Sequence, residues 1–86
     1  MGLYTMSLYT CIITGVLKNG KDFRFTKNTV ASQEVAVREH FEYMLNLAKC
    51  DKDSSLMIWE GVMFDLKAFA SLRLASVKLN SEEITK

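Results

Sequence analysis

The stretch CIITGVLKNGKDFRFTK, residues 11–27, places two runs rich in β-branched and aromatic residues on either side of an Asn-Gly dipeptide. That dipeptide is the strongest short-range signal for a β-hairpin, because both of its residues tolerate the positive φ that tight turns require. The stretch therefore predicts two antiparallel strands joined at Asn19 and Gly20. Their alignment decides the fold, because a shift of one residue turns every side chain to the opposite face of the sheet.

Two alignments of this hairpin are compatible with its sequence. A two-residue Asn-Gly loop would mix charged and apolar side chains on one face of the sheet. A three-residue loop, residues 18–20 with Gly20 left-handed, separates them and sets Phe23 opposite Gly15, where the ring covers the bare backbone. We prefer this second alignment, which gives one largely apolar face made of Tyr9, Cys11, Ile13, Leu17, Phe23 and Phe25. The opposite face is mixed and consists of Thr10, Ile12, Thr14, Val16, Asp22, Arg24 and Thr26.

The segment after the hairpin has the apolar periodicity of an amphipathic helix. Ser32 is a suitable N-cap, and the periodic pattern continues to about Cys50. Phe41 lies on the apolar face of this helix. Such a face needs a surface to cover, and we expect it to cover the side of the hairpin that carries Phe23 and Phe25.

The second half of the chain is less regular. A polar linker, DKDSS at residues 51–55, precedes LMIWEGVMFDL, which fits a second hairpin that bends at Glu60 and Gly61. Residues 66–79 fit either a strand or a helix. We prefer a strand from Ser71, because a helix would set polar side chains in the middle of its apolar arc.

These elements predict an α+β protein with a single domain over residues 1–86. An antiparallel sheet of about four strands carries one long helix on one face, in the order β-β-α-β-β. We expect residues 1–6 to be loosely held.

Composition and charge exclude several classes of function. The 86 residues carry a formal net charge of +1, which gives no whole-molecule field to attract nucleic acid. Cys11 and Cys50 lack the clustering with Cys or His that zinc requires, and no phosphate loop or nucleophile motif is present. We therefore expect no enzyme, no metal and no cofactor. The apolar run near the start is too short to cross a bilayer and follows no basic residues, so we expect a cytoplasmic protein without a membrane partner.

The segment KDFRFTK, residues 21–27, resembles the aromatic central strand of RNA-recognition-motif domains, which stack bases on such side chains. Asp22 and Arg24 hold positions at which that family has Gly, and too few residues precede the segment for the family's topology. We therefore expect Phe23 and Phe25 in the core. RNA binding through a basic hairpin end is an alternative function, with phosphate contacts from Lys18, Lys21, Arg24 and Lys27.

The mixed face of the hairpin predicts a further contact. Ile12 and Val16 make this face too apolar to be fully solvated, whereas its Thr and charged residues make it too polar for a closed core. A chain of 86 residues is also close to the size at which one core is only marginally sufficient. We therefore predict a homodimer, or a partner protein, that covers Ile12 and Val16.

The first half, from ITGVLKNGKDFRFTK (residues 13–27) to SQEVAVREHFEYML (residues 32–45), resembles the hairpin-then-helix opening of small bacteriophage proteins that neutralise host toxins or defence factors. The resemblance implies a non-enzymatic inhibitor or antitoxin that binds and occludes a host toxin, nuclease or defence factor. If the protein is phage-encoded, it acts in the host cytoplasm. A structural assembly subunit is a further alternative.

Overall fold

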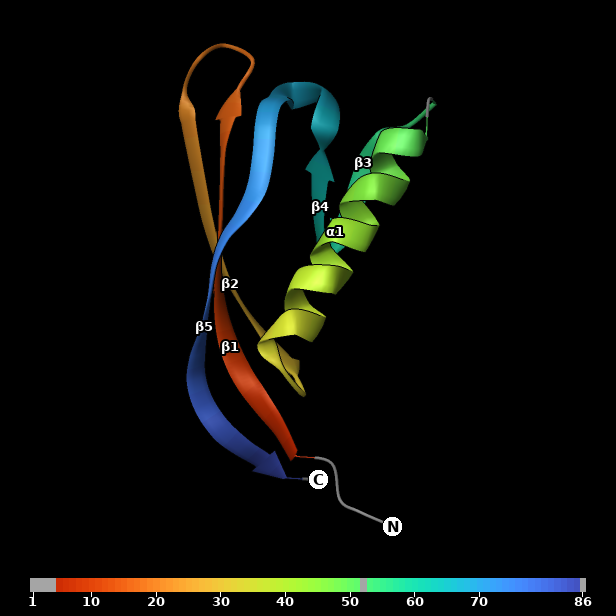
Figure 1. The fold of residues 1–86 in the computed structure, drawn as a ribbon. Helices are drawn as coiled ribbons and strands as arrows, with labels where there is room; N and C mark the ends of the chain where they lie inside the picture. The colour runs from red at the N-terminus through yellow and green to blue at the C-terminus, as the bar shows by residue number, and fades with distance from the viewer. Residues whose placement is uncertain (1–4, 52, 86) are drawn as a thin grey trace.

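The computed structural model describes residues 5–51 and 53–85 and confirms the α+β class and the order β-β-α-β-β, with one further strand at the end (Figure 1). The elements are β1 (Thr5–Leu17), β2 (Asp22–Ala31), α1 (Glu34–Cys50), β3 (Leu56–Trp59), β4 (Val62–Asp65), the short 3-10 helix η1 (Leu66–Ala68) and β5 (Phe69–Thr85). The expectation for residues 1–6 falls mostly on residues 1–4, which lie outside the described residues, and β1 already begins at Thr5. In the described part of the chain, no helix is both long and apolar enough to cross a membrane.

The β1–β2 hairpin has the predicted three-residue loop. The Leu17 amide donates to the Lys21 carbonyl over 2.8 Å, and the Gly20 amide donates to the Leu17 carbonyl over 2.9 Å. Gly20 has a φ of 90°, which is the left-handed conformation that this loop requires. Gly15 pairs with Phe23, so the expected alignment is confirmed.

The sequence allowed either a strand or a helix for residues 66–79. In the structure the first three of these residues form η1, and strand β5 begins at Phe69. It pairs antiparallel with β1, so β1 is the central strand of a three-stranded sheet in the order β2-β1-β5. The pairing shifts register at four places, and at each place β5 contributes extra residues. Such β-bulges bend and twist a strand, and they are common at sheet edges.

The second hairpin, β3–β4, also forms where the sequence predicts it. Trp59 pairs with Val62, and the two residues between them have positive φ, 49° at Glu60 and 76° at Gly61. This turn matches the twist of the strands that it joins. The hairpin forms a separate two-stranded sheet, so the strands are divided between two sheets.

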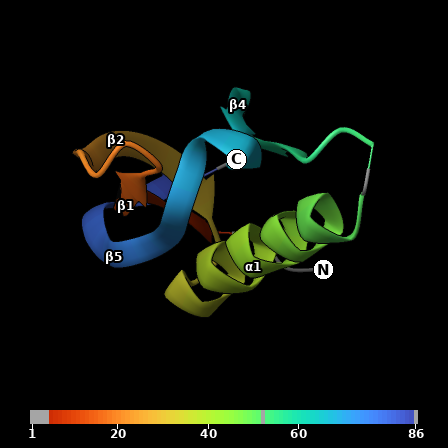
Figure 2. The same ribbon diagram turned by 90° about the horizontal axis from the view of Figure 1, so that it is seen from above.

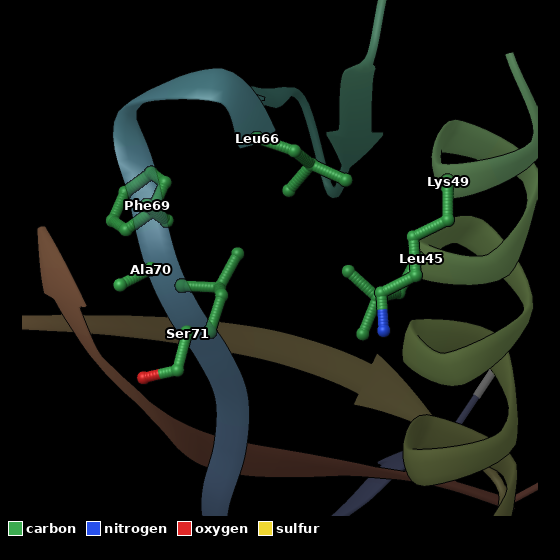
Figure 3. A pocket seen from close by; sticks show the side chains of 7 residues that line it. Leu45, Lys49, Leu66, Phe69, Ala70 and Ser71 are labelled. Atoms are coloured by element: carbon green, nitrogen blue, oxygen red, sulfur yellow. The ribbon is translucent and has the colours of Figure 1, made fainter. Parts of the chain in front are cut away.

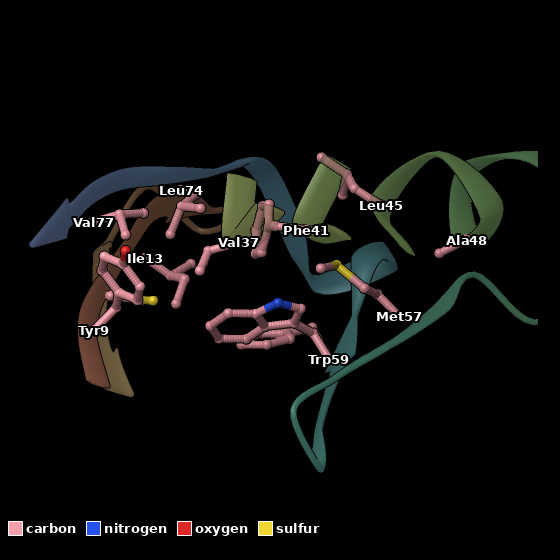
Figure 4. Close-up of a cluster of buried hydrophobic side chains, with 12 residues drawn as sticks. Tyr9, Ile13, Val37, Phe41, Leu45, Ala48, Met57, Trp59, Leu74 and Val77 are labelled. Carbon is pink, nitrogen blue, oxygen red and sulfur yellow. The ribbon is translucent and has the colours of Figure 1, made fainter. Parts of the chain in front are cut away.

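One face of the three-stranded sheet carries the core, and two elements share its cover. Figure 2 shows α1 nearer β5 and β4 nearer β2. Phe41 of α1 meets Trp59 edge-on, with ring centroids 5.4 Å apart (Figure 4). The buried apolar residues are Tyr9, Cys11, Ile13, Val37, Phe41, Leu45, Ala48, Met57, Trp59, Phe64, Leu74 and Val77.

Phe23 and Phe25 face this core, as expected, but the second hairpin and the start of β5, rather than the helix, supply their aromatic contacts. Their rings lie 6.3 and 5.9 Å from that of Phe64, and Phe23 also packs edge-on against Phe69 at 5.0 Å. These are the distances and angles that aromatic pairs prefer. The side chains that KDFRFTK would need for stacking on bases are therefore turned into the protein.

Helix α1 begins later than expected. Gln33 rather than Ser32 occupies the N-cap position, and its side chain makes no capping hydrogen bond. The first turn is stabilised instead by Glu34, which lies near the positive end of the helix dipole and forms a 3.1 Å ion pair with Arg38.

The molecule is elongated. Its Cα radius of gyration is 14.4 Å and its extents are 48 × 25 × 17 Å. A compact domain of this length would have a radius of gyration of about 12 Å. The elongation leaves much of the surface of both sheets without cover from the chain itself.

Candidate functional site

The outer face of the three-stranded sheet, which neither α1 nor β3–β4 covers, brings together cations from two strands that are not neighbours. Thr14 of β1 pairs with Arg24 of β2 on one side and with Arg73 of β5 on the other. Two strand spacings separate the arginine backbones, which is about 10 Å. Further along, Thr10 pairs with Lys78. We call this surface the basic sheet face and define it by Arg24, Arg73 and Lys78.

A hollow of about 430 Å³ lies on the basic sheet face. Its lining includes Thr14, Val16, Asp22, Arg24, Ser71 and Arg73. Neither arginine forms an ion pair with a carboxylate of the described residues, and Asp22 is the one acidic side chain described on this face. The hollow therefore combines two guanidinium groups with Thr and Ser hydroxyls that can donate hydrogen bonds to an anion.

The four cations proposed from the sequence do not form one cluster. Lys18 and Lys21 lie exposed in and beside the hairpin loop, and Arg24 lies on the basic sheet face. Lys27 pairs with Cys11, so it stands on the core side of the edge strand β2. Sequence reasoning missed Arg73 and Lys78, because the alignment of β5 on β1 is a long-range property with bulges in it.

The two apolar residues proposed as a dimer or partner face, Ile12 and Val16, do lie on the same face as Arg24 and Arg73. Both are partly exposed. Ile12 pairs with Thr26 and Ser76, so polar side chains border it on each side. The structure brings them together with cations rather than in an apolar patch of their own.

A second candidate surface is the outward face of the β3–β4 hairpin. Ile58 and Met63 stand opposite each other in the register, and their side chains are 52% and 62% exposed. Leu56 on the same face is also exposed. We call these three residues the apolar hairpin face. The sequence contains a signal for this exposed apolar surface in LMIW, residues 56–59. All four residues are apolar, but a strand with one covered face buries only Met57 and Trp59.

Acidic residues lie within and next to the β3–β4 hairpin, and Asp65 pairs with Leu56 of the apolar hairpin face. Residues 51–65 contain Asp51, Asp53, Glu60 and Asp65 against a single lysine. All four carboxylates belong to exposed residues. The hairpin thus has an apolar centre and an acidic border, which is the arrangement of many protein interfaces.

A second hollow, of about 370 Å³, lies between α1 and the start of β5 (Figure 3). It is lined mainly by Leu45, Leu66, Phe69 and Leu72, with Lys49 at one side. It is partly open to solvent, and both polar and apolar atoms line it.

Two residue types that often carry chemistry lie apart from these surfaces. Cys11 is fully buried, and burial, with a smaller contribution from the charge of Glu60, raises its pKa to about 11, so the reactive thiolate is disfavoured. His40 is exposed on α1. Among the described residues, no group of three or more Cys, His, Asp or Glu side chains is placed to hold a metal ion.

Comparison with known proteins gives no relative for this chain: no family model matches it, and neither a curated protein nor a solved structure is significantly similar to it.

Proposed function

We propose that the protein is a small non-enzymatic binding protein that occludes a partner protein, in the manner of a phage-type inhibitor or antitoxin directed against a host toxin, nuclease or defence factor. The observation that carries this proposal is the apolar hairpin face. Exposed apolar patches with a polar border are typical of protein interaction sites. Met63 has a flexible side chain that can adapt to a partner surface, and Ile58 beside it adds a branched apolar side chain.

Charge complementarity favours a partner that handles nucleic acid. The acidic border of the apolar hairpin face, Asp51, Asp53, Glu60 and Asp65, would meet the basic residues that line a nuclease or RNA-binding site. An inhibitor that docks there would block access of the substrate. The resemblance of the first half to phage inhibitors supports the same class of function.

The test is a comparative capture experiment with tagged protein in a bacterial lysate. The double variant Ile58→Ser/Met63→Ser removes the apolar anchors from exposed positions, so the fold should be retained. The matched control Val30→Ser/Val35→Ser removes two exposed apolar side chains elsewhere. We expect a partner that the original protein and the control retain in stoichiometric amount and that the hairpin variant loses.

The captured partner is then assayed for nuclease or toxin activity with and without the original protein. Loss of activity on binding supports an inhibitor. A partner held equally by the hairpin variant, or unchanged activity of the partner, would contradict the proposal.

A further inference from the structure

We propose that the basic sheet face is a second, independent binding site, and that its ligand is the phosphodiester backbone of a nucleic-acid strand. The row Arg24, Thr14 and Arg73 crosses all three strands of the sheet. The row carries two guanidinium groups and one hydroxyl group, and it borders the 430 Å³ hollow.

The chemistry of the face fits phosphate better than it fits a protein surface. Phosphate oxygens are bound in protein–nucleic acid complexes by Arg and Lys together with Ser, Thr and Asn side chains. Those residue types dominate here, and they are Thr10, Thr14, Thr26, Asn28, Ser71, Ser76, Arg24, Arg73 and Lys78. Protein interfaces instead concentrate aromatic and large apolar anchors at their centre.

The two arginines are free to take up an anion. Neither is neutralised by an ion pair with a described carboxylate, whereas Arg38 on the helix is paired with Glu34. Asp22 lies near Arg24 and reduces the positive field at that end of the row. On β5, no acidic side chain that the structure describes lies next to Arg73 or Lys78 on this face. An Arg fork can bind one phosphate with two parallel hydrogen bonds.

The orientation of the aromatic side chains predicts how the strand is recognised. Phe23 and Phe25 pack against Phe64 on the core side, so they cannot stack on bases at the outer face. Without stacking or base-edge contacts, binding depends on phosphate charge and is independent of base identity. It should therefore weaken steeply as the salt concentration rises.

The experiment measures fluorescence anisotropy of a labelled uridine oligonucleotide as the protein is added, over a series of salt concentrations. The variant Arg24→Gln/Arg73→Gln is compared with Lys49→Gln/Lys67→Gln, which removes the same charge from exposed positions away from the basic sheet face. We expect measurable binding at low salt. The arginine variant should reduce the slope of log K against log salt by about 0.7 for each lost contact, and the lysine variant should leave it nearly unchanged.

An adenosine oligonucleotide of the same length should bind with an affinity within a few-fold of the uridine one, and polyglutamate should bind far more weakly. Three results would overturn the proposal: no binding at low salt, equal effects of the two double variants, or binding of polyglutamate as tight as that of RNA. The apolar hairpin face is unaltered in both variants, so failure here leaves the inhibitor proposal standing.

Discussion

Gly15 shows how closely β5 approaches the centre of the sheet. A Cβ atom at this position would collide with the carbonyl oxygen of Ser71, and it would lie 3.3 Å from the Leu72 side chain. The backbone φ of Gly15 is not in the left-handed region, so the requirement for glycine comes from space rather than from conformation.

Gly15→Ala should therefore lower the free energy of unfolding by about 1–3 kcal/mol, because β5 must move to admit the methyl group. Urea unfolding followed by circular dichroism measures the change. The control Thr26→Val, at an exposed position of β2, should stay within about 0.5 kcal/mol. A stability of Gly15→Ala equal to that of the control would mean that β5 lies further from β1 than described.

The two cysteines differ in accessibility and should differ in reactivity. Cys11 is fully buried and its pKa is raised to about 11, whereas Cys50 is exposed at the end of α1. A thiol-specific reagent at neutral pH should modify one thiol per chain quickly and the second one only after denaturation. Cys50→Ser should abolish the fast phase. Rapid modification of two thiols in the native protein would contradict the burial of β1.

The raised pKa of Cys11 also predicts a dependence of stability on pH. Well below pH 9 the thiol is protonated in both the folded and the unfolded state, so its contribution to stability is constant. Above pH 9 the thiol of the unfolded chain ionises while the buried thiol does not, so stability falls until about pH 11. The loss should be up to about 3 kcal/mol. Comparison with Cys11→Ala isolates this contribution from the other groups that titrate, and an equal fall in both proteins would exclude it.

At the scale of single elements, α1 depends on its contact with the second hairpin. Phe41 is fully buried and packs edge-on against Trp59. Phe41→Ala should cost about 3–5 kcal/mol of stability, since the helix would lose its central anchor. Tyr43→Ala, on a side chain that is 61% exposed, should have little effect. Urea unfolding of both variants makes the comparison, and similar losses would mean that the helix packs through a different face.

Local signals in the sequence were sufficient for the two hairpins, because each hairpin is fixed by its own turn. Gly20 and Gly61 have the positive φ that their sequence context indicates, and the β1–β2 register follows from the loop length. The site was not predictable in the same way. Arg73 reaches the row of Arg24 only through the bulged pairing of β5 with β1, which no local pattern encodes.

The cover of the core was also only partly predictable. The periodicity of α1 correctly places Phe41 inside, but it cannot show that Phe64 rather than the helix meets the rings of Phe23 and Phe25. That outcome depends on how the second hairpin and the helix share one sheet face. The contact joins Phe23 to Phe64, about forty positions later in the chain, so no local pattern predicts it. Leu47 of α1 is exposed, and the buried positions of the helix are Val37, Phe41, Leu45 and Ala48.

For the whole molecule, the homodimer stays a prediction, and the structure alters where we expect its interface. A face-to-face dimer through Ile12 and Val16 would bring the arginines of the basic sheet face close to those of the second copy, which is unfavourable. Pairing through the apolar hairpin face also brings carboxylates of the two copies near each other, but only at its border, because its three defining residues carry no charge. We therefore expect the free protein to pair through Ile58 and Met63.

Sedimentation at micromolar concentration should give twice the 9.8 kDa of the chain. Met63→Glu should yield monomers, and Val16→Glu should leave the dimer intact. A monomeric original protein would refute the dimer, and dissociation by Val16→Glu alone would place the interface on the outer sheet face. Large oligomers whose size grows with concentration would instead favour the structural assembly subunit, since a basic face and an acidic hairpin on one chain can join head to tail.

The pairing of β5 with β1 also governs how the protein reaches its native state. Thr10 pairs with Lys78, which is 68 positions later in the chain (78 minus 10). The central strand β1 therefore cannot complete its pairing until the last strand, β5, has been made. Until then β1 has one open edge, and the β1–β2 hairpin exposes aromatic residues that later become buried. Closing so long a loop is slow compared with forming a hairpin or a helix. During synthesis the chain therefore passes through a period in which it is vulnerable to proteases and to self-association, and this period ends only when β5 aligns along β1.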